Sequence, residues 1–180
     1  MKSLDIILPT LAHLVDVVDE FNKYIGKLTE VFKSIFYEDC WVVDVAEKLL
    51  PRYAGIGIYK KTWKSDDKKW GLRFLVAAES GSAFQGCLIG VAKFDYTYEN
   101  DRLSEIQTAL NEKLGTGNVS SWWPYHRFAD NCYAWPGPIN VQQLSVISEE
   151  KQLEYVEYYR GVFSKLKEVA PLVDDILGVG

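Results

Sequence analysis

The most constraining feature of this sequence is an apolar repeat within residues 10–36. Its members are spaced alternately three and four residues apart, so they fall on one stripe of an α-helix about seven turns long. They are Leu11, Leu14, Val18, Phe21, Ile25, Leu28, Phe32 and Ile35. The stripe predicts a long N-terminal helix that lies on the core of the domain. A coiled-coil seam with another chain requires the same strict alternation, so that alternative stays open.

A second long helix is expected at the other end of the chain. Ser148 is a candidate N-cap, and apolar residues then recur at helical spacing as far as Leu177. Gly161 and Pro171 are unfavourable inside a helix, which predicts a bend or a break near Pro171. Two terminal helices with apolar stripes are buried most simply against one face of a sheet, or against each other.

The middle of the chain has the pattern of an antiparallel meander. Apolar and polar residues alternate there, and short turns rich in Gly, Ser, Asp and Lys separate the alternating stretches, as in β-hairpins. Strands are expected at residues 54–63, 70–79 and 84–96, with two more within residues 122–147. The last two would flank a turn at Pro136–Pro138. In the third strand, a common face is expected to carry Phe84, Leu88, Phe94 and Tyr96.

Two shorter helices complete the expected fold. Residues 39–50 have an apolar face and are stopped by Pro51, while residues 100–114 are ended by Gly115. The apolar face of the first rests on Trp41, Val42, Val45, Ala46 and Leu49. The sequence thus predicts one α+β domain over residues 1–180. It would hold an antiparallel meander sheet of about five strands, two long terminal helices and two shorter helices.

Composition excludes several functional classes. The net charge of −5 argues against a general nucleic-acid binder, which usually needs a basic surface. Cys40, Cys87 and Cys132 are far apart and form no cluster with the two histidines, so no metal site or cofactor is expected. Unpaired thiols fit a reducing cytoplasm. No apolar run approaches the roughly 18 residues of a membrane span, so a soluble cytoplasmic protein is expected.

The most unusual segment is Trp122–Phe128, which reads Trp-Trp-Pro-Tyr-His-Arg-Phe. Large aromatic residues and arginine dominate binding hot spots, and they also stack on nucleic-acid bases or sugars. The candidate binding residues are Trp122, Trp123, Tyr125, His126, Arg127 and Trp135. Three interpretations stay open: the tryptophans plug one edge of the sheet with Arg127 closing its end, they form a protein-binding surface, or they line a pocket for a small ligand or nucleotide.

A nucleophilic site is a further reading of the same region. His126, Asp130 and Cys132 lie close together in the sequence and are the residue types of a cysteine nucleophile with its base. However, no glycine elbow precedes Cys132 and no helix is expected to start after it. The sequence therefore assigns no catalytic residue.

Five segments together resemble a known family. In chain order they are Trp70-Gly-Leu-Arg-Phe, Gly86-Cys-Leu-Ile-Gly90, Trp122-Trp123-Pro124-Tyr125, Trp135 and Val173-Asp174-Asp175-Ile176-Leu177. This pattern is similar to the C-terminal accessory region of a bacterial PD-(D/E)XK nuclease-like family of unknown function, found in prophages and defence loci. The family's nuclease core, with its catalytic Asp and Glu-x-Lys, has no counterpart here. The resemblance implies an accessory fold and a setting in phage–bacteria conflict, and it transfers no catalytic residue.

The leading functional hypothesis is a non-enzymatic module that binds another protein, through the Trp122–Phe128 surface or a terminal helix, in phage defence or counter-defence. The first alternative is a sensor or enzyme for a nucleotide or nucleic acid, with a pocket formed by His126, Arg127 and Asp130. The second alternative is a structural homodimer joined through the N-terminal helix. No membrane partner is expected.

Overall fold

A computed structural model describes residue 23 and residues 25–45, 55–67, 70–78, 87–129 and 149–179. The structural statements below concern this part of the chain. Of the predicted N-terminal helix, residues 25–35 are helical, and its earlier part lies outside the described residues. The same holds for Trp135 and for the turn at Pro136–Pro138.

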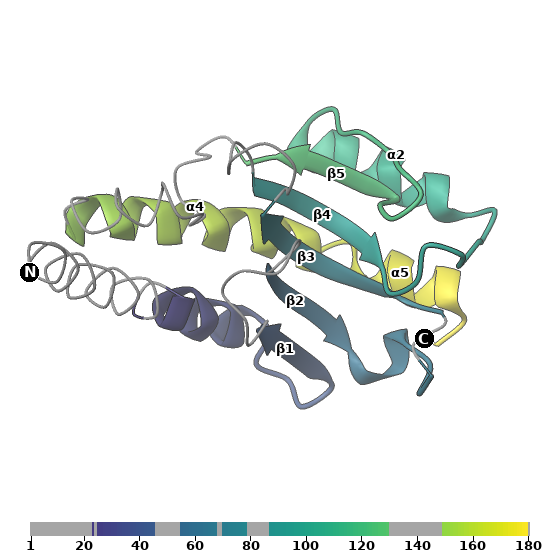
Figure 1. The fold of residues 1–180 in the computed structure, drawn as a ribbon, viewed down its shortest axis with the longest axis horizontal. Helices are drawn as coiled ribbons and strands as arrows, with labels where there is room; N and C mark the ends of the chain where they lie inside the picture. The colour runs from purple at the N-terminus through teal and green to yellow at the C-terminus, as the bar shows by residue number, and fades with distance from the viewer. Residues whose placement is uncertain are drawn as a thin grey trace, which may run out of the picture.

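Five antiparallel strands form one sheet in chain order, so the predicted meander is confirmed (Figure 1). They are β1 (Trp41–Val45), β2 (Gly55–Lys60), β3 (Leu72–Ala78), β4 (Cys87–Lys93) and β5 (Tyr125–Phe128). A short 3-10 helix, η1 (Lys61–Trp63), follows β2 where the sequence predicted more strand. The strand register places Ile58, Phe74, Val91 and Tyr125 side by side across the sheet. All four are fully buried, so this row marks the core face.

The helix predicted at residues 39–50 is wrong for its described part, because residues 41–45 form β1. This strand pairs along its whole length with β2, from Trp41 opposite Lys60 to Val45 opposite Ile56. Three of its five residues are valines, and β-branched side chains favour strands over helices. The apolar spacing fitted a helix, but the residue types and the partner strand decided the conformation.

Every described helix contributes to one hydrophobic core on the same face of the sheet. The helices are residues 25–35, α2 (Leu103–Leu114), α4 (Glu149–Lys167) and α5 (Ala170–Leu177). In Figure 1, α4 and α5 pass behind the sheet. The N-terminal segment packs on α4 as well, with the Phe32 and Phe163 ring centroids 4.3 Å apart. Leu28 and Phe32 are fully buried, so the described part of the stripe faces this chain's own core.

The expected break in the C-terminal helix is confirmed, since α4 ends at Lys167 and α5 begins at Ala170, next to Pro171. The shorter helix is fixed to the sheet by Asp174. One carboxylate oxygen accepts a hydrogen bond from the indole Nε1 of Trp63 at 2.7 Å, and the other pairs with Lys60 Nζ at 2.5 Å. The Val173–Leu177 motif therefore serves packing in this fold.

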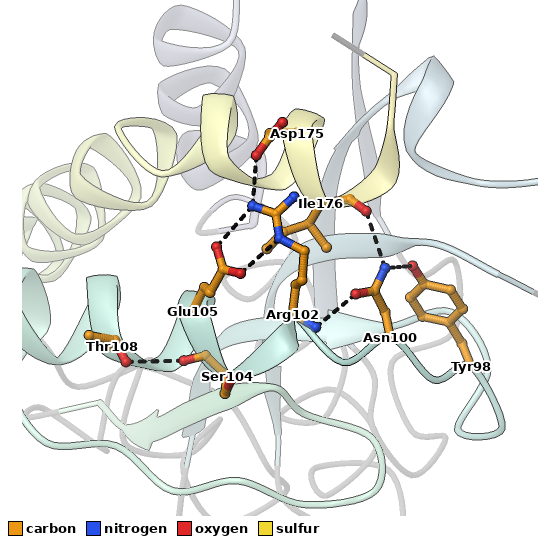
Figure 2. Close-up of polar contacts among 8 residues, drawn as sticks. All are labelled: Tyr98, Asn100, Arg102, Ser104, Glu105, Thr108, Asp175 and Ile176. Carbon is orange, nitrogen blue, oxygen red and sulfur yellow. Dashed lines mark hydrogen bonds and ion pairs between the residues drawn. The ribbon is translucent and has the colours of Figure 1, made fainter.

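The neighbouring Asp175 joins α5 to the start of α2 (Figure 2). Arg102 donates to Asp175 at 2.7 Å and to both oxygens of Glu105, at 2.7 and 2.9 Å. Beside it, the side-chain amide of Asn100 donates to the carbonyl of Ile176 at 3.1 Å. Among the described residues, none of the helices combines the length and apolar character that crossing a membrane would need.

Candidate functional site

The sheet face opposite the core carries no described helix, and its side chains form the candidate site. Strand alternation and register place Gly57, Leu75, Gly90 and His126 in one row across this outer face. Two of the four are glycines, so the middle of the face lacks side chains and is recessed around Leu75. A second, smaller apolar cluster lies here, formed by Leu75, Ala77, Leu88, Ala92 and Trp123.

This cluster forms part of the lining of a pocket of about 350 Å³. Leu75, Leu88 and Ala92 form its apolar lining, while polar groups come from Arg73, Lys93, Ser120 and His126, and aromatic rings from Trp122 and Trp123. Pockets of at least ~300 Å³ with mostly apolar walls and a few convergent polar groups are typical of small-molecule sites. The arrangement is therefore that of a binding site for a compact organic ligand.

Arg73 is the most informative residue of this pocket. Its Nε is buried and has no hydrogen-bond partner in the part of the chain that the structure describes. The guanidinium carbon lies 5.1 Å from the centre of the Phe94 ring, and the side chain passes over Gly57, where a β-carbon would stand 3.5 Å from Arg73 Cδ. Burial lowers the pKa of Arg73, and the charge of Asp44 on β1 offsets part of that effect. The guanidinium still stays charged at neutral pH, since its ordinary pKa is far above 7.

Lys93, at the end of β4, also lines the pocket and is only 8% exposed. It stands opposite Leu72, so strand alternation directs its side chain towards the core face. Arg73 is therefore the cation of the outer face, and Asp44 on β1 is the acid that acts on it. The buried Nε without an acceptor favours a ligand that brings one.

The two tryptophans are held in place by backbone bonds. The amide of Lys93 donates to the carbonyl of Trp122 at 2.8 Å, and Ser120 and Trp123 exchange backbone hydrogen bonds of 2.9 and 3.2 Å. Trp123 is 6% exposed and lies 5.7 Å from the ring of His126, whereas Trp122 is 45% exposed and contacts Tyr96. The pocket thus has one fixed aromatic wall and one ring at its mouth that a planar ligand could stack on.

The structure brings Trp122, Trp123 and His126 together in the outer pocket. Tyr125 and Arg127 lie on the opposite face of the sheet. Tyr125 is fully buried in the core, and its hydroxyl donates to the carbonyl of Gly115 at 2.8 Å. Burial raises the pKa of this phenol, so it stays protonated as a structural donor. Arg127 donates to the carbonyl of Leu114 and caps the last turn of α2. Asp130 lies outside the described residues, as does Trp135.

Sequence reasoning missed Arg73 and Lys93 as site residues. A signal for Arg73 was present, since it is the one charged residue in the apolar strand of residues 70–78. In the described residues no group of three or more His, Cys, Asp or Glu side chains is placed to hold a metal ion. Comparisons of the chain with protein-family models, with curated proteins and with solved structures found no match. The chemistry of the pocket is therefore the basis for a functional conclusion.

Proposed function

We propose that this protein binds a small anionic ligand with a planar ring, of the size and kind of a nucleoside monophosphate, in the outer-face pocket. The observation that carries the proposal is the buried Nε of Arg73, which has no hydrogen-bond partner in the described chain and belongs to a side chain that lines an apolar pocket. An anionic group of the ligand would pair with Arg73. The planar ring would lie against Trp122 and Trp123.

The energetics of Arg73 support a binding role over a structural one. A buried donor without an acceptor destabilises a folded protein, and replacing it with an apolar side chain of similar length is often neutral or stabilising. Natural proteins retain such costly residues where function requires them. Arg73→Met should therefore leave the free protein at least as stable as the parent while removing the main anion contact.

The test is a thermal-shift and calorimetric titration with AMP, GMP, CMP and UMP at constant ionic strength. A ligand present at about 100 times its dissociation constant stabilises by roughly 2.7 kcal/mol, which corresponds to a rise in Tm of roughly 5–10 °C for a chain of this size. Arg73→Met should abolish the rise. Arg160→Met is the matched control, because Arg160 is a surface arginine paired with Glu157 at 3.0 Å.

Free nucleosides and inorganic phosphate separate the two halves of the expected ligand. Each should bind more weakly than the monophosphate, since each engages only the aromatic or only the cationic part of the pocket. A protein that shows no shift with any of these compounds, or whose Arg73→Met variant responds like the parent, would contradict the proposal.

Binding of another protein is the second candidate, supported by the exposed aromatic pair of Trp122 and Tyr96, whose ring centroids lie 5.4 Å apart. A protein partner would contact this pair at the mouth of the same pocket. A role in phage defence or counter-defence and a homodimer both stay predictions. A pull-down with the parent and with Trp122→Ala tests the partner: loss of a specific protein in the variant supports it, and an unchanged set of proteins contradicts it.

A further inference from the structure

The cationic side of the outer pocket is formed by one guanidinium. Arg73 lines the pocket, and its buried Nε has no acceptor within the described chain. Lys93 lines the pocket as well, but alternation along β4 directs its side chain to the core face. Lys64 lies close by, donates to the hydroxyl of Tyr59 at 3.2 Å, and is not one of the described residues that line the pocket. One guanidinium neutralises one negative charge.

Asp44 stands beside this cation on the same face of the sheet. Val43 pairs with Ile58, which lies in the buried core row, so alternation places Asp44, the next residue of β1, on the outer face opposite Gly57. A β-carbon built on Gly57 would lie 3.8 Å from Arg73 Nη1 and 3.9 Å from the backbone oxygen of Asp44. The guanidinium and β1 therefore approach each other across the glycine.

The carboxylate of Asp44 acts on Arg73 without supplying the missing acceptor. Burial lowers the pKa of Arg73, and the charge of Asp44 offsets part of that effect, so the two charges interact. The Nε of Arg73 nevertheless has no hydrogen-bond partner in the described structure. An anion bound at Arg73 would thus be attracted by the guanidinium and repelled by a carboxylate on the neighbouring edge strand.

These two charges set a limit on the charge of the ligand. Attraction to the guanidinium grows in proportion to the negative charge of the ligand, and Asp44 cancels part of that attraction. The cost of moving an ion from water into apolar surroundings grows with the square of its charge. A second negative charge in this pocket would therefore add more cost than the single guanidinium can offset.

We propose that the outer pocket selects a ligand with a single negative charge, a phosphodiester such as a cyclic nucleoside monophosphate, and that Asp44 disfavours more highly charged phosphates. This inference rests on the proposed function, because it concerns the anion that Arg73 binds, and it narrows the class of ligand. A phosphodiester retains two oxygens that a guanidinium can bind in bidentate fashion. Its planar base would still lie against Trp122 and Trp123.

The experiment compares cyclic AMP, AMP and ADP, which share one base and one ribose and differ in the charge of the phosphate. Binding is measured by calorimetry at constant ionic strength and at about pH 8, where an imidazole is ordinarily neutral, so that His126 adds no charge. The parent should bind cyclic AMP at least about threefold more tightly than AMP, and AMP more tightly than ADP. Cyclic GMP and GMP repeat the comparison with a second base.

Asp44→Asn separates the charge of the ligand from its shape, because asparagine keeps the size of the side chain. The affinities for AMP and ADP should rise by more than the affinity for cyclic AMP, so the preference narrows by about threefold or more. Asp39→Asn is the matched control, since Asp39 is also an exposed acid but precedes β1 and does not face Gly57. Added sodium chloride should narrow the preference of the parent and of Asp39→Asn, because salt screens the repulsion.

The outcomes separate this inference from the proposed function. AMP binding as tight as that of cyclic AMP in the parent would overturn the inference and leave the proposed function in place. An equal preference in the parent and in Asp44→Asn would do the same. Arg73→Met should bind none of the three nucleotides, and cyclic AMP binding that survives in this variant would also overturn the inference. A parent protein that binds none of them would contradict the proposed function itself.

Discussion

Asp174 offers the sharpest test of how the C-terminal helix is attached to the sheet. It is the single acceptor that the described structure gives to the indole Nε1 of Trp63, and Trp63 is fully buried. The same carboxylate pairs with Lys60, with only 15% of the Asp174 side chain and 23% of the Lys60 side chain exposed. Asp174→Ala removes both interactions at once.

The two losses differ in kind. A buried donor left without an acceptor costs about 1–3 kcal/mol, because it was removed from water and gains nothing in return. The lysine is close enough to solvent to be rehydrated, so the lost ion pair adds about 1 kcal/mol. We expect Asp174→Ala to lower the free energy of unfolding by about 3 kcal/mol, or Tm by roughly 6–12 °C for a chain of this length.

Asp174→Asn and Asp175→Ala are the matched controls. The asparagine keeps an oxygen for Trp63 and loses only the charge, so its cost should be about 1 kcal/mol. Asp175 is adjacent, but its side chain is 68% exposed and its bond to Arg102 is a surface ion pair, which contributes at most about 0.5 kcal/mol. Urea denaturation followed by tryptophan fluorescence measures all three. Equal losses for Asp174→Ala and Asp174→Asn would refute the argument that the orphaned indole dominates.

Two further predictions concern the 115–117 loop and the end of the N-terminal helix. Gly117→Ala places a β-carbon 2.2 Å from a ring carbon of Tyr125, which its hydrogen bond to Gly115 holds in place, so denaturation should show a loss of at least about 1–3 kcal/mol. A loss smaller than that of Asp175→Ala would contradict the packing. The hydrogen bond from Lys167 lowers the pKa of Glu38 below its ordinary 4.5, so this carboxylate stabilises the fold above that pH and the contribution is lost as the pH falls through the lowered pKa. The parent should thus lose slightly more stability than Glu38→Gln between pH 7 and pH 3, and equal losses would show that the pair contributes nothing.

The fold class could be predicted from periodicity because each described element but one buries its apolar face in the expected way. The meander order, the helix that ends at Gly115 and the break near Pro171 all follow from local signals. The exception is β1, where the apolar spacing fitted a helix. Spacing is judged within one short segment of sequence, and the partner strand β2 lies outside that segment. Pairing across the chain decided that segment, and no local pattern records such pairing.

The alternation of β4 was predicted more accurately than its length. Leu88 and Phe94 were expected to share a face, and both lie beside Arg73: Leu88 lines the same pocket, and the Phe94 ring centre is 5.1 Å from the guanidinium carbon. The core face is formed by Ile89 and Val91. The strand itself ends at Lys93, short of the predicted end at residue 96.

The candidate site could be located from the sequence only as a segment. Composition singled out Trp122–Phe128, but strand alternation divides that segment between the core face and the outer pocket. The residues that complete the outer pocket come from β3 and β4, about 30 to 50 positions earlier in the chain. A linear reading groups residues by position, whereas the sheet groups them by face.

Arg73 is a position where the sequence works against the stability of its own fold. Its buried Nε has no acceptor in the described structure, and it is the one charged residue of an otherwise apolar strand. Departures of this kind are expected where a site needs them. Arg73→Met should therefore maintain or raise stability and weaken binding in the outer pocket. If the variant stabilises the protein with no loss of binding, Arg73 is an ordinary imperfection of the sequence, and the outer pocket loses its principal support.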